Sequence, residues 1–227
     1  MKMQGAIFDM DGTLVDSLSF WDRFWRDMGK RYFNNPDFKM DAEHFDNHVR
    51  TMIFSHAISY LHGYLNIPSS PEEFDEFAAK YVEWFYGSVV TAKPGAKELL
   101  TALRERGVRI SLASATDRRY LSIALESCGL IEFFTPETIL SCSDIGVGKE
   151  RPDVFLAAAE VMGTPISETA VFEDSALALE TAKGAGFITV GVYDAHQLSQ
   201  KRLVAASDIY LGEDKTLADA VAQIEAE

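Results

Sequence analysis

The hydrophobic positions of the chain follow two different patterns, and the change between them predicts two structural parts. Residues 18–92 are rich in aromatic side chains at the three- and four-residue spacing of amphipathic helices. The last of these helices has a start signal, because Ser70 can cap a helix that opens at Pro71 while Glu73 completes a capping box. Three helices are expected, with apolar stripes through 20–28, 49–64 and 74–85.

After Lys93-Pro94-Gly95, short apolar runs alternate with helical patterns that often end at a glycine. Alternation of this kind indicates a parallel sheet covered by helices on both faces. We therefore predict an α/β protein: a Rossmann-like core from 1–16 and 93–227, and an inserted all-α domain at 17–92. The expected strands are 6–8, 108–113, 138–140, 170–172, 188–192 and 208–211, and the expected core helices are 96–106, 117–128, 152–162, one ending near 183, and 217–224.

The length, net charge and cysteine content of the chain limit which kinds of binding partner and which location are expected. The 227 residues carry a net charge of −14, which argues against nucleic acids and anionic membranes. No apolar run approaches the ~20 residues that cross a bilayer, and the first residues do not read as a signal peptide. The two cysteines, Cys128 and Cys142, lack metal-like spacing and suit reduced thiols. We expect a cytoplasmic protein, monomeric or weakly dimeric.

Polar residues follow the predicted strands, where parallel sheets bind their ligands. The first strand runs directly into Asp9-Met10-Asp11-Gly12-Thr13, and the second ends at Ser114. Lys149 lies in a loop ahead of a helix, and a later strand runs into Glu173-Asp174-Ser175. These side chains are expected to gather at one edge of the sheet.

Close carboxylates repel one another unless a cation lies between them, and an oxygen-only donor set suits Mg²⁺. Asp9 and Asp174 are natural ligands, and a metal-bound Asp9 can attack phosphorus. Asp11 can serve as general acid and then general base. Ser114 and Lys149 offer a hydroxyl and a positive charge to the phosphoryl oxygens.

These residues, over almost the whole chain, resemble the haloacid-dehalogenase superfamily of phosphohydrolases. Its four motifs match as Asp9-Met10-Asp11-Gly12-Thr13, Leu112-Ala113-Ser114, Lys149 before Pro152-Asp153-Val154-Phe155, and Phe172-Glu173-Asp174-Ser175. The resemblance implies that Asp9 is the nucleophile and that Mg²⁺ is bound by Asp9, the Asp11 backbone carbonyl and Asp174. Glu173 would sit in or just outside the metal shell. The helical insert resembles the cap of the branch that contains β-phosphoglucomutase and many sugar-phosphate phosphatases.

The expected activity is therefore Mg²⁺-dependent hydrolysis of a small phosphorylated metabolite, with a sugar phosphate as the default. In the insert, Arg50 and Trp21 are the candidate substrate contacts, although a surface salt bridge explains Arg50 equally well. A phosphosugar mutase is the alternative, but the mutases carry a His and a Lys where this chain aligns Trp21 and Asp117. A non-catalytic binding protein is disfavoured because no catalytic position is lost.

Overall fold

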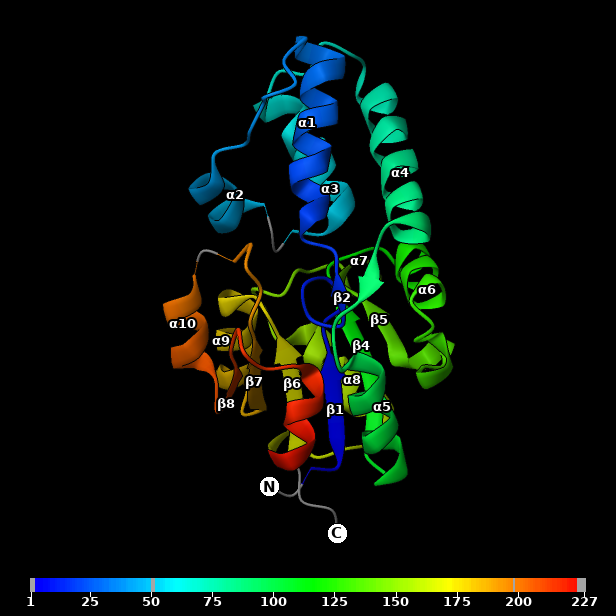
Figure 1. Ribbon diagram of the computed structural model, residues 1–227, viewed down its shortest axis with the longest axis vertical. Coiled ribbons are helices and arrows are strands. Elements are labelled where there is room, and N and C mark those ends of the chain that lie inside the picture. Colours follow the sequence, from blue (N-terminus) through cyan, green and yellow to red (C-terminus); the bar gives the residue numbers. More distant parts are fainter. Residues whose placement is uncertain (1–2, 50–51, 198, 224–227) are drawn as a thin grey trace.

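A six-stranded parallel sheet forms the centre of the protein. The computed structural model describes residues 3–49, 52–197 and 199–223 (Figure 1). The strand order is β5-β4-β1-β6-β7-β8, and every neighbouring pair is parallel. The strands are β1 (Gly5–Phe8), β4 (Arg109–Ser114), β5 (Ile139–Ser141), β6 (Thr169–Glu173), β7 (Ile188–Val192) and β8 (Ile209–Leu211).

Both faces of this sheet are buried, as the unbroken apolar strands predict. Because successive side chains of a strand point to opposite faces, Ala6 and Phe8 of β1 join one hydrophobic core and Ile7 joins another. Phe8 also stacks on Phe172 of the adjacent strand with ring centroids 4.4 Å apart. The central strand β1, which Asp9 directly follows, is therefore packed on both faces and paired along both edges.

Helices cover the two faces of the sheet. On the face of Ala6 and Phe8 lie α5 (Ala96–Glu105) and α6 (Arg118–Ser127), and the final 3₁₀ helix η4 (Leu217–Gln223) packs on α5. On the opposite face lie α8 (Asp153–Met162) and α9 (Ala176–Gly184), with α10 (Gln200–Ala206) packed against α9. The expected α/β architecture is confirmed. Short elements complete this part: η1 (Ile131–Phe133), η2 (Pro136–Thr138), α7 (Cys142–Ile145) and η3 (Ile166–Glu168).

Four further helices lie together beyond the carboxyl ends of the strands (Figure 1), and we call them the cap. Two chain crossings connect the cap to the sheet, and the short strands β2 (Val15–Asp16) and β3 (Thr91–Ala92) pair antiparallel at these crossings. The insert boundaries at 17 and 92 stay a prediction. The cap helices are α1 (Ser19–Phe33), α2 (Ala42–His48), α3 (Phe54–Tyr64) and α4 (Pro71–Ser88).

The cap helices differ in part from the sequence expectation. The start of α4 is confirmed, because the Ser70 hydroxyl accepts a hydrogen bond from the Glu73 backbone nitrogen at 3.2 Å. The stripe expected to begin at 49 becomes helical only at Phe54. The short helix α2 is not one of the three helices expected from the apolar stripes, and its Asp41 cap accepts from the His44 backbone nitrogen at 2.7 Å. Among the described residues, no helix is both long and apolar enough to cross a membrane.

Candidate active site

The loop after β1 brings the first pair of carboxylates to the edge of the sheet. The Asp9 backbone nitrogen donates to the carbonyl of Phe172 at 2.9 Å, which extends the β1–β6 ladder one residue further. Gly12 follows with φ +84°, a conformation that side chains of L-residues disfavour. A Cβ at Gly12 would also lie 2.5 Å from Asp174 Oδ2, so this turn requires glycine twice over.

Three buried carboxylates meet at this edge. Asp9, Glu173 and Asp174 each place an oxygen within 4.8 Å of the others, and all three are at most 5 % exposed. Burial raises the pKa of Asp9 well above its usual range, and the negative charge of Glu173 adds to this effect. Asp174 accepts hydrogen bonds from the side chains of Thr13 at 3.3 Å and Gln197 at 2.6 Å. Three carboxylates this close together repel one another.

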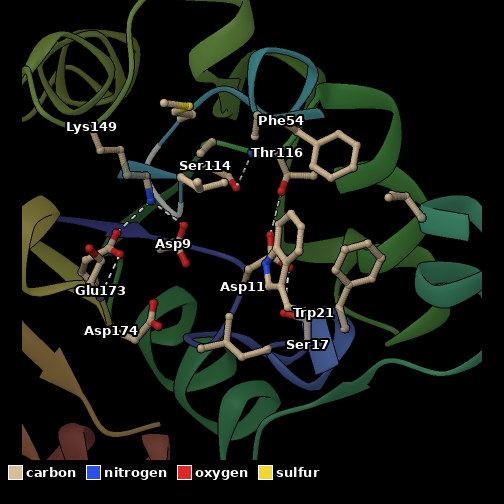
Figure 2. Close-up of a pocket in the computed structure, with 18 of the residues that line it drawn as sticks. Asp9, Asp11, Ser17, Trp21, Phe54, Ser114, Thr116, Lys149, Glu173 and Asp174 are labelled. Atoms are coloured by element: carbon tan, nitrogen blue, oxygen red, sulfur yellow. Dashed lines mark hydrogen bonds and ion pairs between the residues drawn. The ribbon is translucent and has the colours of Figure 1, made fainter. Parts of the chain in front are cut away.

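Lys149 is the buried cation of the site. Its ammonium forms ion pairs with Asp9 and, at 2.8 Å, with Glu173 (Figure 2). Burial alone would lower the pKa of Lys149, but the charges of Asp9 and Glu173 raise it above its ordinary value. Lys149 therefore stays protonated at any physiological pH.

The cluster fits a divalent cation by its chemistry. Its ligand atoms are all carboxylate oxygens, the donor type that Mg²⁺ prefers. A divalent ion among these carboxylates would also reduce the repulsion from Glu173, which adds to the effect of burial on the pKa of Asp9.

The carboxylate of Asp11 lies outside this cluster and accepts hydrogen bonds from three hydroxyl groups. Its Oδ1 accepts from Ser17 at 2.7 Å and from Tyr86 at 2.6 Å, and its Oδ2 accepts from Thr116 at 2.8 Å. Ser114 ends β4 next to this group and is 1 % exposed. Its hydroxyl accepts from the Thr116 backbone nitrogen at 3.1 Å and so fixes the loop after β4.

A cleft of about 90 Å³ lies between the sheet edge and the cap (Figure 2). The structure brings Asp9, Asp11, Ser114, Lys149, Glu173, Asp174 and Trp21 together along its wall, as the sequence analysis expects. Arg50 lies outside the described residues. The cap contributes mostly apolar side chains, namely Leu18, Phe20, Trp21, Val49, Met52, Phe54, Ala57 and Val82.

Four polar residues of the site were not identified from the sequence. Ser17, Thr116 and Tyr86 contact Asp11, and Gln197 contacts Asp174. Thr116 directly precedes the expected helix 117–128, and the sequence analysis assigned it no role in the site. Ser17 directly follows the short strand β2, which was not predicted, whereas Tyr86 and Gln197 do not directly follow a strand. Ser17 and Thr116 lie close to motif residues, so proximity along the chain is a signal for them. No local pattern distinguishes Tyr86 or Gln197.

Comparisons with known proteins agree with this architecture. Over 214 residues the chain is 27 % identical to hexitol phosphatase A of Escherichia coli, covering 91 % of this chain and 92 % of that one. It is 30 % identical over 200 residues to the Arabidopsis thaliana protein SUPPRESSOR OF QUENCHING 1, covering 84 % of this chain but only 18 % of that longer protein.

A solved structure from Thermotoga maritima, which has a provisional β-phosphoglucomutase name, superposes with a TM-score of 0.76. It is 22 % identical and covers 97 % of this chain and 99 % of its own, so it supports the fold. The family model of the haloacid dehalogenase-like hydrolases matches residues 3–186. The resemblance inferred from the motifs is thereby confirmed, and the chain belongs to the haloacid dehalogenase-like hydrolases.

Proposed function

We propose that this hydrolase removes the phosphoryl group from a small phosphorylated metabolite through an aspartyl-phosphate on Asp9. The observation that best supports this proposal is the buried cluster of Asp9, Glu173 and Asp174 beside the protonated Lys149, facing the cleft between the sheet edge and the cap. Such a site matches a dianionic phosphate together with a divalent cation.

In the first step, an Asp9 carboxylate oxygen attacks phosphorus and the bond from phosphorus to the leaving oxygen breaks. Asp11 gives its proton to that oxygen, so an alcohol departs. In the second step, Asp11, now a carboxylate, takes a proton from water as the water attacks phosphorus. The bond between phosphorus and Asp9 breaks, inorganic phosphate leaves, and both carboxyl groups return to their first states.

Lys149 and Ser114 would hold the phosphoryl oxygens during both steps. The ammonium of Lys149 contacts Asp9 directly, so an oxygen of a phosphoryl group on Asp9 lies within its reach. Mg²⁺ would be held by Asp9, Asp174 and the Asp11 backbone carbonyl, with Glu173 in or just outside the shell. When bound, Mg²⁺ supplies positive charge that reduces the repulsion between Asp9 and the substrate phosphate.

The proposed substrate class is the phosphorylated sugars and polyols. Support comes from the name of the Escherichia coli relative, a hexitol phosphatase, and from the small size of the cleft. The apolar cap wall would contact the carbon-bound hydrogens of such a molecule and keep out water. Trp21 lines this wall and is the proposed cap contact. A role for Arg50 remains a prediction.

The experiment is a screen of sugar and polyol monophosphates with Mg²⁺ that measures inorganic phosphate. One arm supplies β-glucose 1-phosphate with catalytic glucose 1,6-bisphosphate and also measures glucose 6-phosphate. We expect phosphate release, because this chain lacks the His and the Lys that the mutases carry at the positions of Trp21 and Asp117. Trp21 lines the cleft but has no imidazole, and Asp117 is not among the described residues that line the cleft. Glucose 6-phosphate that forms faster than phosphate would assign the chain to the mutases, and no release from any substrate would reject the proposal.

We also propose a cellular location and an oligomeric state for the enzyme. Both cysteines are free, which suits a reducing cytoplasm. A monomer or weak dimer is expected, and sedimentation at several protein concentrations tests this.

A further inference from the structure

We propose that Tyr86 is a positioning residue for Asp11, so that its phenol fixes the carboxylate that moves protons. The inference rests on the proposed function in one respect, the acid–base role of Asp11. Tyr86 lies near the end of α4, and its hydroxyl donates to Asp11 Oδ1 at 2.6 Å. Nothing in the four motifs includes this residue.

Tyr86 is held at both ends. Its backbone carbonyl accepts from the Ser127 hydroxyl of α6 at 2.6 Å, which ties the end of α4 to the sheet domain. Its ring packs near Phe85 and Tyr120, with centroids 5.8 and 6.5 Å away. Only 7 % of the residue is exposed, so the phenol has one defined position from which it reaches Asp11.

The phenol of Tyr86 donates its hydrogen bond to a carboxylate and not to a neutral acceptor. A buried donor on a carboxylate contributes more than a neutral hydrogen bond does.

The two carboxylate oxygens of Asp11 accept hydrogen bonds from different donors. Ser17 and Tyr86, one at each chain crossing between cap and sheet, both donate to Oδ1. Thr116, from the loop after β4, donates alone to Oδ2. Two donors keep Oδ1 an acceptor and leave Oδ2 as the oxygen that passes a proton to the leaving group and takes one from water. Tyr86 thereby sets which oxygen of Asp11 faces the reaction.

The test compares Tyr86→Phe with the wild type on two substrates. Glycerol phosphate has an alkoxide leaving group that needs a proton, whereas p-nitrophenyl phosphate releases a phenolate that does not. We expect kcat/KM for glycerol phosphate to fall about 10–100-fold, as for loss of one hydrogen bond to a charged group. For p-nitrophenyl phosphate we expect kcat/KM within ~3-fold of wild type, because departure of the phenolate needs little acid catalysis. Equal losses on both substrates, or no loss on either, would overturn the inference.

A matched control lies on the same helix. The hydroxyl of Tyr81 donates to Asp27 Oδ2 at 2.7 Å, and neither residue is among the described residues that line the cleft. Tyr81→Phe removes the same atom from the same type of bond and should leave both kcat/KM values unchanged. A split between substrates in Tyr81→Phe would show that any loosening of α4 has this effect, and would reject a specific role for Tyr86.

The mechanism also predicts non-additivity. In an Asp11→Asn background, Tyr86→Phe should cause no further loss on glycerol phosphate, because the group that it positions no longer transfers protons. An undiminished further loss would mean that Tyr86 acts on another group. If Tyr86→Phe does not fold, Ser17→Ala removes the other donor to Oδ1 and must produce the same split between substrates. Uniform behaviour of Ser17→Ala would then overturn the inference.

Failure of the proposed function would look different. A wild-type protein that releases no phosphate from these two substrates or from any substrate of the screen rejects both the function and this inference. An active wild type with an unaffected Tyr86→Phe rejects the inference alone.

Discussion

The two walls of the cleft, one from the sheet edge and one from the cap, are lined by different kinds of side chain. The sheet wall presents ionisable groups at or next to the end of a strand or before a helix, and four of them, Asp9, Lys149, Glu173 and Asp174, are almost fully buried. The cap wall presents aromatic and aliphatic side chains from helices and from the segments between them. Phe20, for example, contacts Phe54 in the cleft wall and Phe24 behind it, with centroids 6.5 and 5.5 Å away.

We expect the sheet wall to carry out the reaction and the cap wall to determine which substrates are preferred. Buried charges are costly unless they are paired, so the sheet wall tolerates little change and acts on the group that all phosphomonoesters share. Apolar contacts are less directional, and one such contact can be exchanged for another at modest cost. Substitutions in the sheet wall should therefore affect every substrate, whereas substitutions in the cap wall should change the preference among substrates.

The largest expected effect comes from Asp9→Asn. The amide keeps the shape of the side chain but cannot attack phosphorus, so turnover of every substrate should fall by at least ~10⁴-fold. Circular dichroism should show an unchanged fold. The matched control is Asp22→Asn, since Asp22 is an exposed aspartate of α1 outside the catalytic set, and it should retain activity. Substantial phosphatase activity in Asp9→Asn would disprove the assignment of the nucleophile.

Removal of divalent cations should come next. Chelation removes the positive charge that would reduce the repulsion among Asp9, Glu173 and Asp174, so both activity and thermal midpoint should fall. Mg²⁺ at 100 times its Kd should restore about 2.7 kcal/mol of stability as well as activity. Ca²⁺ should restore the midpoint but little activity, because its geometry is looser.

The Asp174→Asn variant distinguishes this site from other cation effects. Its thermal midpoint should no longer respond to Mg²⁺ if Asp174 is a ligand. Full activity in the presence of a chelator would reject the metal requirement altogether.

The sequence predicted the sheet wall well because its signals are local. A buried strand is a continuous apolar run, and the residue after it lies at the edge of the sheet wherever the rest of the chain goes. The positions of Asp9, Ser114 and Asp174 follow from this rule. The last expected helix, 217–224, proved to be a 3₁₀ helix over Leu217–Gln223.

The cap wall was predicted less well because its geometry depends on packing between helices. The aromatic stripes indicated helices, but the spacing alone did not say which rings line the cleft. Tyr86 and Gln197 enter the site from an end of α4 and from a loop after β7, where no strand end marks them. The short elements β2, β3 and α10 were not predicted, because runs of two to seven residues show too little periodicity.

A cap substitution should have a smaller and more selective effect. Trp21 lines the cleft and stacks on Trp25 with ring centroids 5.1 Å apart. Trp21→Phe should keep the fold and change the ratio of kcat/KM between a hexitol phosphate and glycerol phosphate by about 10-fold. The control Trp84→Phe makes the same change at a tryptophan that is 48 % exposed and should leave the ratio unchanged. A uniform loss on all substrates in Trp21→Phe would contradict the division between the walls.

The smallest effect on activity is expected from a substitution at the chain crossing that contains β3, which connects the cap to the sheet. Lys93, directly after β3, forms an ion pair of 2.6 Å with the buried Asp194. Burial alone would raise the pKa of Asp194, but the hydrogen bond and charge of Lys93 lower it below its ordinary value. A lowered pKa means that this stabilisation is present above the unfolded-state pKa of ~3.9 and is lost as the pH falls below it.

Lys93→Met should therefore reduce the free energy of unfolding by about 1–3 kcal/mol at pH 7, because it leaves a buried carboxylate with fewer donors. The difference from wild type should begin to shrink as the pH falls below the unfolded-state pKa of ~3.9 and should disappear once the pH has fallen through the lowered pKa of Asp194, and urea unfolding at pH 7 and at a series of acidic pH values measures it. Lys183→Met removes a lysine from the exposed pair with Asp208, at 3.0 Å, and should cost at most ~1 kcal/mol. Because neither lysine is among the described residues that line the cleft, both variants should keep the substrate preference of the wild type. A changed preference in Lys93→Met would show that the crossing, and not the cap wall alone, selects the substrate.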